Sequence, residues 1–174
     1  MRTVFELLPL GIGIALIGAL TWFLLDRDIG IGKWLLAALL FAHGWVHVMF
    51  LFPRPEGAAA TAGGTEWPFD MSRSWLIGGA GLDAGVLRTL GIVMIVATLL
   101  AFFLAALSTV GLLVPAGWWA PMVIAGAAGS TVLLLLFYSP ALLLGFAINL
   151  VLVWLVLASA WSPITGLSRG IGPG

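Results

Sequence analysis

The stretch that decides the fold begins at residue 89 and reads TLGIVMIVATLLAFFLAALSTVGLLV through residue 114. It belongs to an interval of 80 residues, between Arg88 and Arg169, that contains no Asp, Glu, Lys or Arg. A helix crosses a bilayer in about 20 apolar residues, so this interval accommodates three crossings. Turn signals at Pro115 and at Ser139-Pro140 divide it accordingly.

The composition of the whole chain extends this interpretation. Of 174 residues, 62% are apolar and 8% are charged, with a mean hydropathy of +1.19. Soluble domains carry roughly a quarter charged residues, so a soluble fold and intrinsic disorder are both excluded. The net charge is zero, which argues against a nucleic-acid partner. The absence of cysteine excludes disulfides and thiolate metal sites.

The sequence predicts an all-α integral membrane bundle of five transmembrane helices in a single domain, residues 1–174. The polar Asp26-Arg27-Asp28 separates two further apolar runs before residue 53. Strands are disfavoured because the apolar runs do not alternate with polar residues. Glu6 and Pro9 interrupt the first run, so we expect a retained helix rather than a signal peptide. The predicted spans are 4–25, 31–52, 87–111, 118–138 and 141–161.

An odd number of spans places the termini on opposite sides of the membrane. We name the N-terminal side A and the other side B. Tryptophans favour membrane–water interfaces, and five of them fall at predicted helix ends on side B. These are Trp22, Trp34, Trp118, Trp119 and Trp161. Cytoplasmic loops carry an excess of Lys and Arg. Side A has four such residues and side B has three, which slightly favours side A as the cytoplasmic side.

The predicted extramembrane segment, 53–86, contains a candidate short helix. Asp70 is a plausible N-cap for it. Trp67, Met71, Trp75 and Leu76 would then form an apolar face that lies in the interface plane over the bundle. An ordered loop docked on the helix ends is the alternative.

Small residues indicate where helices approach closely, because helix association in lipid depends on tight packing and polar contacts. Gly11, Ala15 and Ala19 repeat every four residues in the first helix. Residues 125–131 are small on every side, so the fourth helix is predicted to lie centrally.

Two histidines, His43 and His47, lie one turn apart on one face of the second helix. Polar groups in hydrocarbon are costly, so they should face the interior of the bundle. Glu6 and Tyr138 are predicted on the same side of the membrane, and Asn149 lies near the level of His43. We expect these five residues to form one polar cluster that opens toward side A.

Three interpretations of this cluster compete. His43 and His47, with Glu6 as third ligand, have spacing and chemistry suited to a divalent metal ion, whereas haem or a pigment fits less well. Alternatively, the histidines form a proton or solute path, as in a small proton-coupled transporter. In the structural interpretation they bond to Asn149, a threonine or a backbone carbonyl and lock the helices. The chain contains no hydrolase or nucleotide motif, and enzymatic activity is not predicted.

Short motifs add a resemblance. His43-Gly44-x-x-His47, the Trp118-Trp119 pair and Gly145-x-x-x-Asn149 resemble small uncharacterised bacterial multi-span membrane proteins. The resemblance implies a helical bundle in a bacterial inner (plasma) membrane and no particular activity. Small subunits of respiratory or photosynthetic complexes are similar, so a non-catalytic accessory or assembly subunit is an alternative function. The predicted partners are the lipid bilayer and either a second copy or a larger membrane complex.

Overall fold

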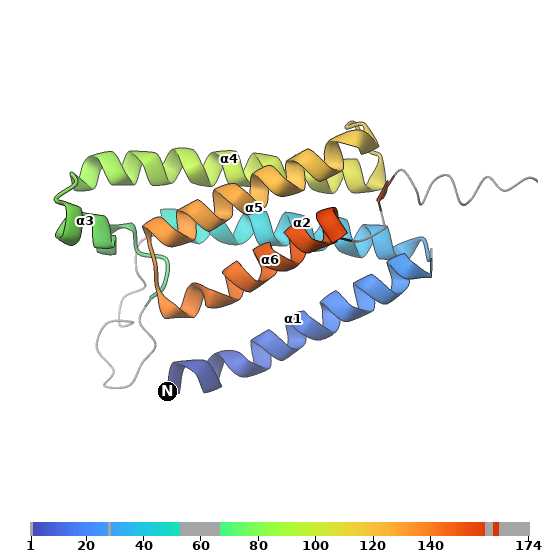
Figure 1. Cartoon of the computed structure of the whole chain (residues 1–174), viewed down its shortest axis with the longest axis horizontal. Coiled ribbons are helices and arrows are strands. Elements are labelled where there is room, and N and C mark those ends of the chain that lie inside the picture. The colour runs from blue at the N-terminus through green and yellow to red at the C-terminus, as the bar shows by residue number, and fades with distance from the viewer. Residues whose placement is uncertain (1, 28, 53–66, 159–161, 164–174) are drawn as a thin grey trace, which may run out of the picture.

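The computed structural model describes the backbone of residues 2–27, 29–52, 67–158 and 162–163, with side chains from residue 11 onward. Within these ranges every regular element is helical (Figure 1). The elements are α1 (Arg2–Asp26), α2 (Ile31–Val46), η1 (His47–Leu51), η2 (Met71–Arg73), α3 (Trp75–Ala80), α4 (Ala84–Val110), η3 (Ala116–Trp118), α5 (Trp119–Leu136), η4 (Pro140–Leu142) and α6 (Leu143–Ala158).

Four helical segments of the described chain are long and apolar enough to cross a membrane. They are Ile31–Leu51, Ala84–Val110, Ala116–Leu136 and Pro140–Ala158. A shorter apolar helix, Gly11–Asp26, precedes them. The all-α class and the membrane-protein class predicted from the sequence are therefore supported by helix length and composition.

The long helices run back and forth along one axis (Figure 1). α4 packs against both α2 and α5, while α6 packs on α5 and α1 on α2. The turn between α5 and α6 lies at the end where the chain begins, and the connection between α4 and α5 lies at the other end. We keep the name side A for the end with the turn between α5 and α6, and side B for the end with the connection between α4 and α5.

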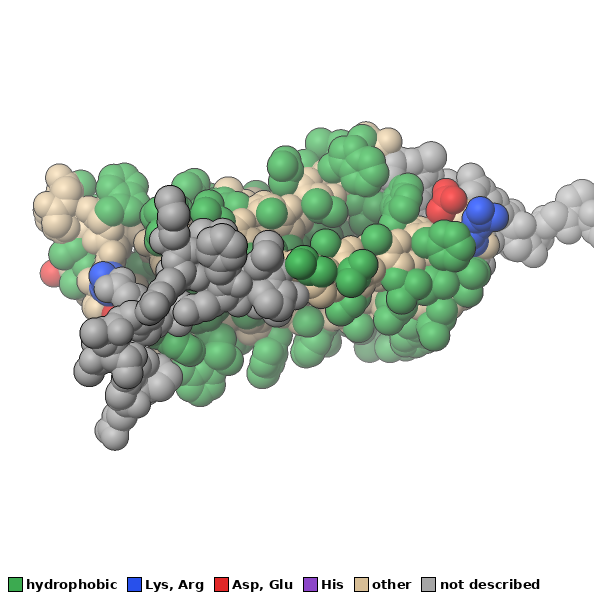
Figure 2. All heavy atoms as spheres, turned by 90° about the horizontal axis from the view of Figure 1, so that it is seen from below, with side chains coloured by type: hydrophobic (Ala, Val, Ile, Leu, Met, Phe, Trp, Pro, Cys, Tyr) green, Lys and Arg blue, Asp and Glu red, His purple; other side chains and the backbone are tan. Residues whose placement is uncertain are grey.

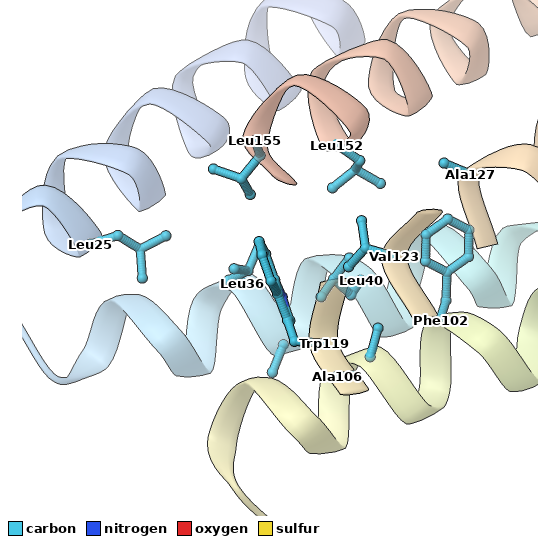
Figure 3. Packing of buried hydrophobic residues seen from close by; sticks show 12 residues of the cluster. Leu25, Leu36, Leu40, Phe102, Ala106, Trp119, Val123, Ala127, Leu152 and Leu155 are labelled. Atoms are coloured by element: carbon cyan, nitrogen blue, oxygen red, sulfur yellow. The ribbon is translucent and has the colours of Figure 1, made fainter. Parts of the chain in front are cut away.

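The larger hydrophobic core draws residues from all five long helices (Figure 3). It comprises Leu25, Leu36, Ala37, Leu40, Phe102, Ala105, Ala106, Trp119, Val123, Ala127, Leu152 and Leu155. A second cluster lies toward side A and comprises Phe50, Ile95, Leu133, Leu134, Phe137 and Leu142. Between them lies the buried polar group described below.

Outside the cores, large apolar side chains face outward. On the face drawn in Figure 2, hydrophobic side chains cover the middle of the molecule and charged ones lie near its two ends. Of the five tryptophans predicted on side B, Trp22, Trp34 and Trp118 are exposed. Trp119 is an exception, because it is buried in the core. Trp161 lies outside the described residues.

The segment before α4 forms two short helices where one was predicted. The carboxylate of Asp70 accepts from the backbone N–H of Ser72 (2.9 Å), so it caps η2 as expected. Ser74 has an extended backbone, which ends η2 and begins α3. Its hydroxyl donates to the Leu136 carbonyl (2.6 Å), and the Trp75 indole donates to the Leu135 carbonyl (2.9 Å). Both acceptors are C-terminal carbonyls of α5 that lack a helical partner.

The small-residue face of α1 does not pack as predicted. A side chain at Gly11 would meet no atom within 4 Å, and Ala15 and Ala19 are exposed. The described residues of α1 that are buried, Thr21 and Leu25, lie near its C-terminal end on another face. The helix therefore contacts the bundle through a face that the four-residue repeat does not mark.

In α5, by contrast, glycine permits close contact with α4. A Cβ atom added at Gly126 would lie 2.9 Å from the ring of Phe102. One added at Gly44 in α2 would lie 2.9 Å from the Cβ atom of the same residue. Phe102 is fully buried between these two helices. The opposite face of α5 is open, since Ala125 and Ala128 are exposed.

Gly129 provides a test of this packing. A Cβ atom there would lie 2.6 Å from the hydroxyl oxygen of Thr98, which is buried. We expect G129A to lower the free energy of unfolding by about 1–3 kcal/mol, because a well-packed core does not accommodate an extra methyl group. The double variant T98A/G129A should recover most of the loss in reversible unfolding in detergent micelles. G117A, where a side chain meets open space, is the matched control. If T98A/G129A were no more stable than G129A, this contact would not be the cause.

Candidate functional site

The site begins where α2 changes its helical geometry. α2 ends at Val46 and continues as the 3-10 helix η1 from His47. The backbone N–H of His47 bonds to the Gly44 carbonyl, three residues earlier. In an α-helix it would bond to the carbonyl of His43. The tightened turn leaves that carbonyl available, and Nδ1 of the His47 ring bonds to it at 2.9 Å.

A polar cluster forms where α2, with its continuation η1, meets α5 and α6. We define this cluster as His43, His47, Ser130, Thr131 and Asn149. The Nε2 atom of His43 lies 2.8 Å from Asn149 Oδ1. The Nε2 atom of His47 lies 2.8 Å from Ser130 Oγ. Asn149 Nδ2 donates to Ser130 Oγ (2.9 Å) and to Thr131 Oγ1 (3.0 Å). Side chains of α2, η1, α5 and α6 are thus joined by direct hydrogen bonds.

One backbone carbonyl fixes the direction of this circuit when both rings are neutral. A carbonyl only accepts, so His47 Nδ1 carries the hydrogen and Nε2 is an acceptor. Ser130 must then donate its hydroxyl hydrogen to His47 and accept from Asn149. This orients the Asn149 amide with its oxygen toward His43, which therefore donates from Nε2. The two histidines consequently adopt opposite tautomers.

The cluster is closed off from its surroundings by apolar packing. Ser130 and His47 are at most 1% exposed, and His43 and Asn149 are also buried. The ring of Phe102 meets His43 edge-on at 5.0 Å between centroids. The two imidazoles lie 5.4 Å apart in a T-shaped arrangement. Their hydrogen-bonded polar atoms are therefore satisfied by other protein groups rather than by solvent.

The structure brings together three of the five residues that the sequence predicted for this site. His43, His47 and Asn149 meet, and the expected shared level of His43 and Asn149 is confirmed. Tyr138 does not join them, because it lies beyond the end of α5 and is 49% exposed. The side chain of Glu6 lies outside the described residues.

Ser130 and Thr131 are members that the sequence did not single out. Hydroxyl groups in helices commonly bond to carbonyls of their own helix, so they carry little information when read from sequence. Thr21, Thr89 and Thr109 do so here, each donating to the carbonyl four residues earlier. The neighbouring Gly129 faces Thr98 of α4 rather than the cluster, so the sequence carries no local signal for these two hydroxyl groups.

The chemistry of this cluster is that of uncharged donors and acceptors. Among the described residues, no group of three or more His, Cys, Asp and Glu is placed to hold a metal ion. The oxygens of Asn149 and Ser130 and the two imidazoles are neutral, and a divalent ion held by them alone would keep its full charge in an apolar setting, which is costly. Every polar side-chain atom of the cluster except Nδ1 of His43 takes part in a described hydrogen bond.

Comparison with known proteins identifies no relatives. No family model matches the chain, and neither a curated protein nor a solved structure matches it.

Proposed function

We propose that the chain is a non-catalytic membrane protein of five crossings whose polar cluster clamps α2 to α5 and α6. The observation that carries this proposal is the closed circuit of hydrogen bonds, in which the polar atoms serve one another. Lipid provides little hydrophobic driving force for helix association, so such contacts have a direct structural use. α1 supplies the fifth crossing in this proposal.

A clamp without a catalytic group suits an accessory or assembly subunit of a larger membrane complex. Such a subunit would meet its partners through the outward-facing apolar surface of the bundle. A bacterial inner membrane is the favoured location, because outer-membrane proteins of bacteria are typically β-barrels. The resemblance to small bacterial membrane proteins remains a prediction.

The proposal is tested by isolating the protein in mild detergent. We expect a colourless preparation without stoichiometric metal, as measured by elemental analysis and visible absorption. On a native gel it should migrate with a larger complex. A free monomer would contradict the accessory role, and a bound metal or chromophore that is lost in H47A would contradict the clamp.

A metal site is the second candidate, and one observation favours it. Histidines that bind metals commonly donate their second ring N–H to a backbone carbonyl. His47 has this arrangement, with Nε2 directed at the Ser130 hydroxyl. Because the other neighbouring groups are uncharged, this candidate depends on Glu6 for a negative ligand. It predicts that zinc raises the unfolding temperature of the protein and that E6Q abolishes this rise. If zinc has no effect, the metal site is wrong, whereas the clamp proposal still stands. A flux in proteoliposomes sensitive to E6Q would instead mark the transporter.

A further inference from the structure

α4 is longer than the hydrocarbon layer that it would cross. Its 27 residues span about 40 Å at about 1.5 Å per residue, against about 30 Å for the hydrocarbon core. Figure 1 shows where the excess lies: α3 and the N-terminal end of α4 extend past the ends of α5 and α6.

Gly91 marks the level at which α5 ends. A Cβ atom there would lie 2.9 Å from the ring of Phe137, the C-cap residue that follows α5. Seven residues of α4 precede Gly91, which corresponds to a projection of about 10 Å. Leu87 is the only buried residue in this part of α4.

The projecting corner is apolar on its outer side. We define it by Trp75, Leu82, Val86 and Leu90, all of which are exposed, Val86 by 63%. The same face continues along α4 through the exposed Val93 and Val96. The indole of Trp75 is held in place by its bond to the Leu135 carbonyl. The corner is therefore an extension of the surface assigned to lipid.

We propose that the projecting corner is immersed in the lipid headgroup layer on side A. This inference rests on the membrane placement proposed above. The headgroup regions add about 10–15 Å to the hydrocarbon thickness in total, or about 5–8 Å on each side, so the projection of about 10 Å reaches through the whole of one such layer. Trp side chains favour this layer, and the exposed Arg88 suits lipid phosphates. In water, the four apolar side chains would form an exposed patch of the kind that marks a protein contact.

Site-directed spin labelling tests this placement without background, since the chain has no cysteine. V86C and V93C are labelled, reconstituted in vesicles of phosphatidylcholine and phosphatidylglycerol, and compared with lipids labelled at known depths. We expect the label of V86C at headgroup depth. The label of V93C should lie about 10 Å deeper, because seven residues correspond to about two turns of the helix.

The two variants separate the possible failures. If V86C were as accessible to an aqueous relaxation agent as a free nitroxide while V93C remained in hydrocarbon, the corner would face water, and the inference would be wrong. A depth for V86C equal to that of V93C would also overturn it. If V93C itself were aqueous, the membrane placement of α4 would fail first.

Discussion

Replacing Asn149 with leucine is expected to lower the free energy of unfolding by about 2–4 kcal/mol, because two buried hydrogen bonds and one partly buried one disappear together. Leucine fills nearly the same volume, so packing changes little. It leaves the Nε2 hydrogen of His43 without its acceptor, and it removes the donor to Ser130 and Thr131. Reversible unfolding in mixed micelles measures the change.

The control for this variant is the next residue along the helix. Leu150 is 71% exposed, and L150A should alter stability by less than about 0.5 kcal/mol. A double-mutant cycle of N149L with H43L measures the interaction energy between the two side chains, because the His43–Asn149 hydrogen bond is already lost in either single variant. Equal stability of N149L and the parent protein would exclude the clamp.

Replacing Phe102 with alanine is expected to cost about 3 kcal/mol. The ring fills the space between Gly44 and Gly126, and neither glycine has a side chain that could move into the vacated volume. The main loss is of packing contacts, because the site cannot collapse around the cavity that alanine leaves. This loss also applies when the unfolded chain stays in lipid or detergent, since helix packing in lipid depends on such contacts. The ring also supports His43 from one side, so the polar cluster should loosen with it.

The neighbouring Phe103 supplies the comparison for this variant. It is 42% exposed and contacts Phe41 on the outer surface. Thermal unfolding should therefore distinguish F102A, with a large decrease in midpoint temperature, from F103A, with a small one. Similar decreases in both variants would show that burial against the glycines is not decisive.

The helices could be predicted from sequence because their signals are local. Charge-free runs, Pro140 and Ser139 give the spans to within a few residues of the observed α4, α5 and α6. The side-chain partners of His43 were partly predictable, since its depth and that of Asn149 follow from the helix rise. These inferences needed only the spacing of residues along each helix.

What could not be predicted depends on how helices rotate against one another. The change from α to 3-10 geometry at His47, which leaves the His43 carbonyl to the His47 imidazole, has no signal in the neighbouring sequence. The rotation of α1 could not be predicted either. Its small-residue repeat marks one face, but the helix contacts the bundle through the face of Thr21 and Leu25. Tyr138 was misplaced because it follows the end of α5, where the chain turns outward.

The most direct measurement of the clamp is the tautomeric state of its two histidines, by nitrogen-15 solid-state NMR of the protein in lipid bilayers. The chain has only these two, so both imidazoles are resolved without assignment from other histidines. The circuit predicts two neutral rings of opposite type, with the hydrogen on Nδ1 of His47 and on Nε2 of His43. Two rings with the same tautomer would contradict it.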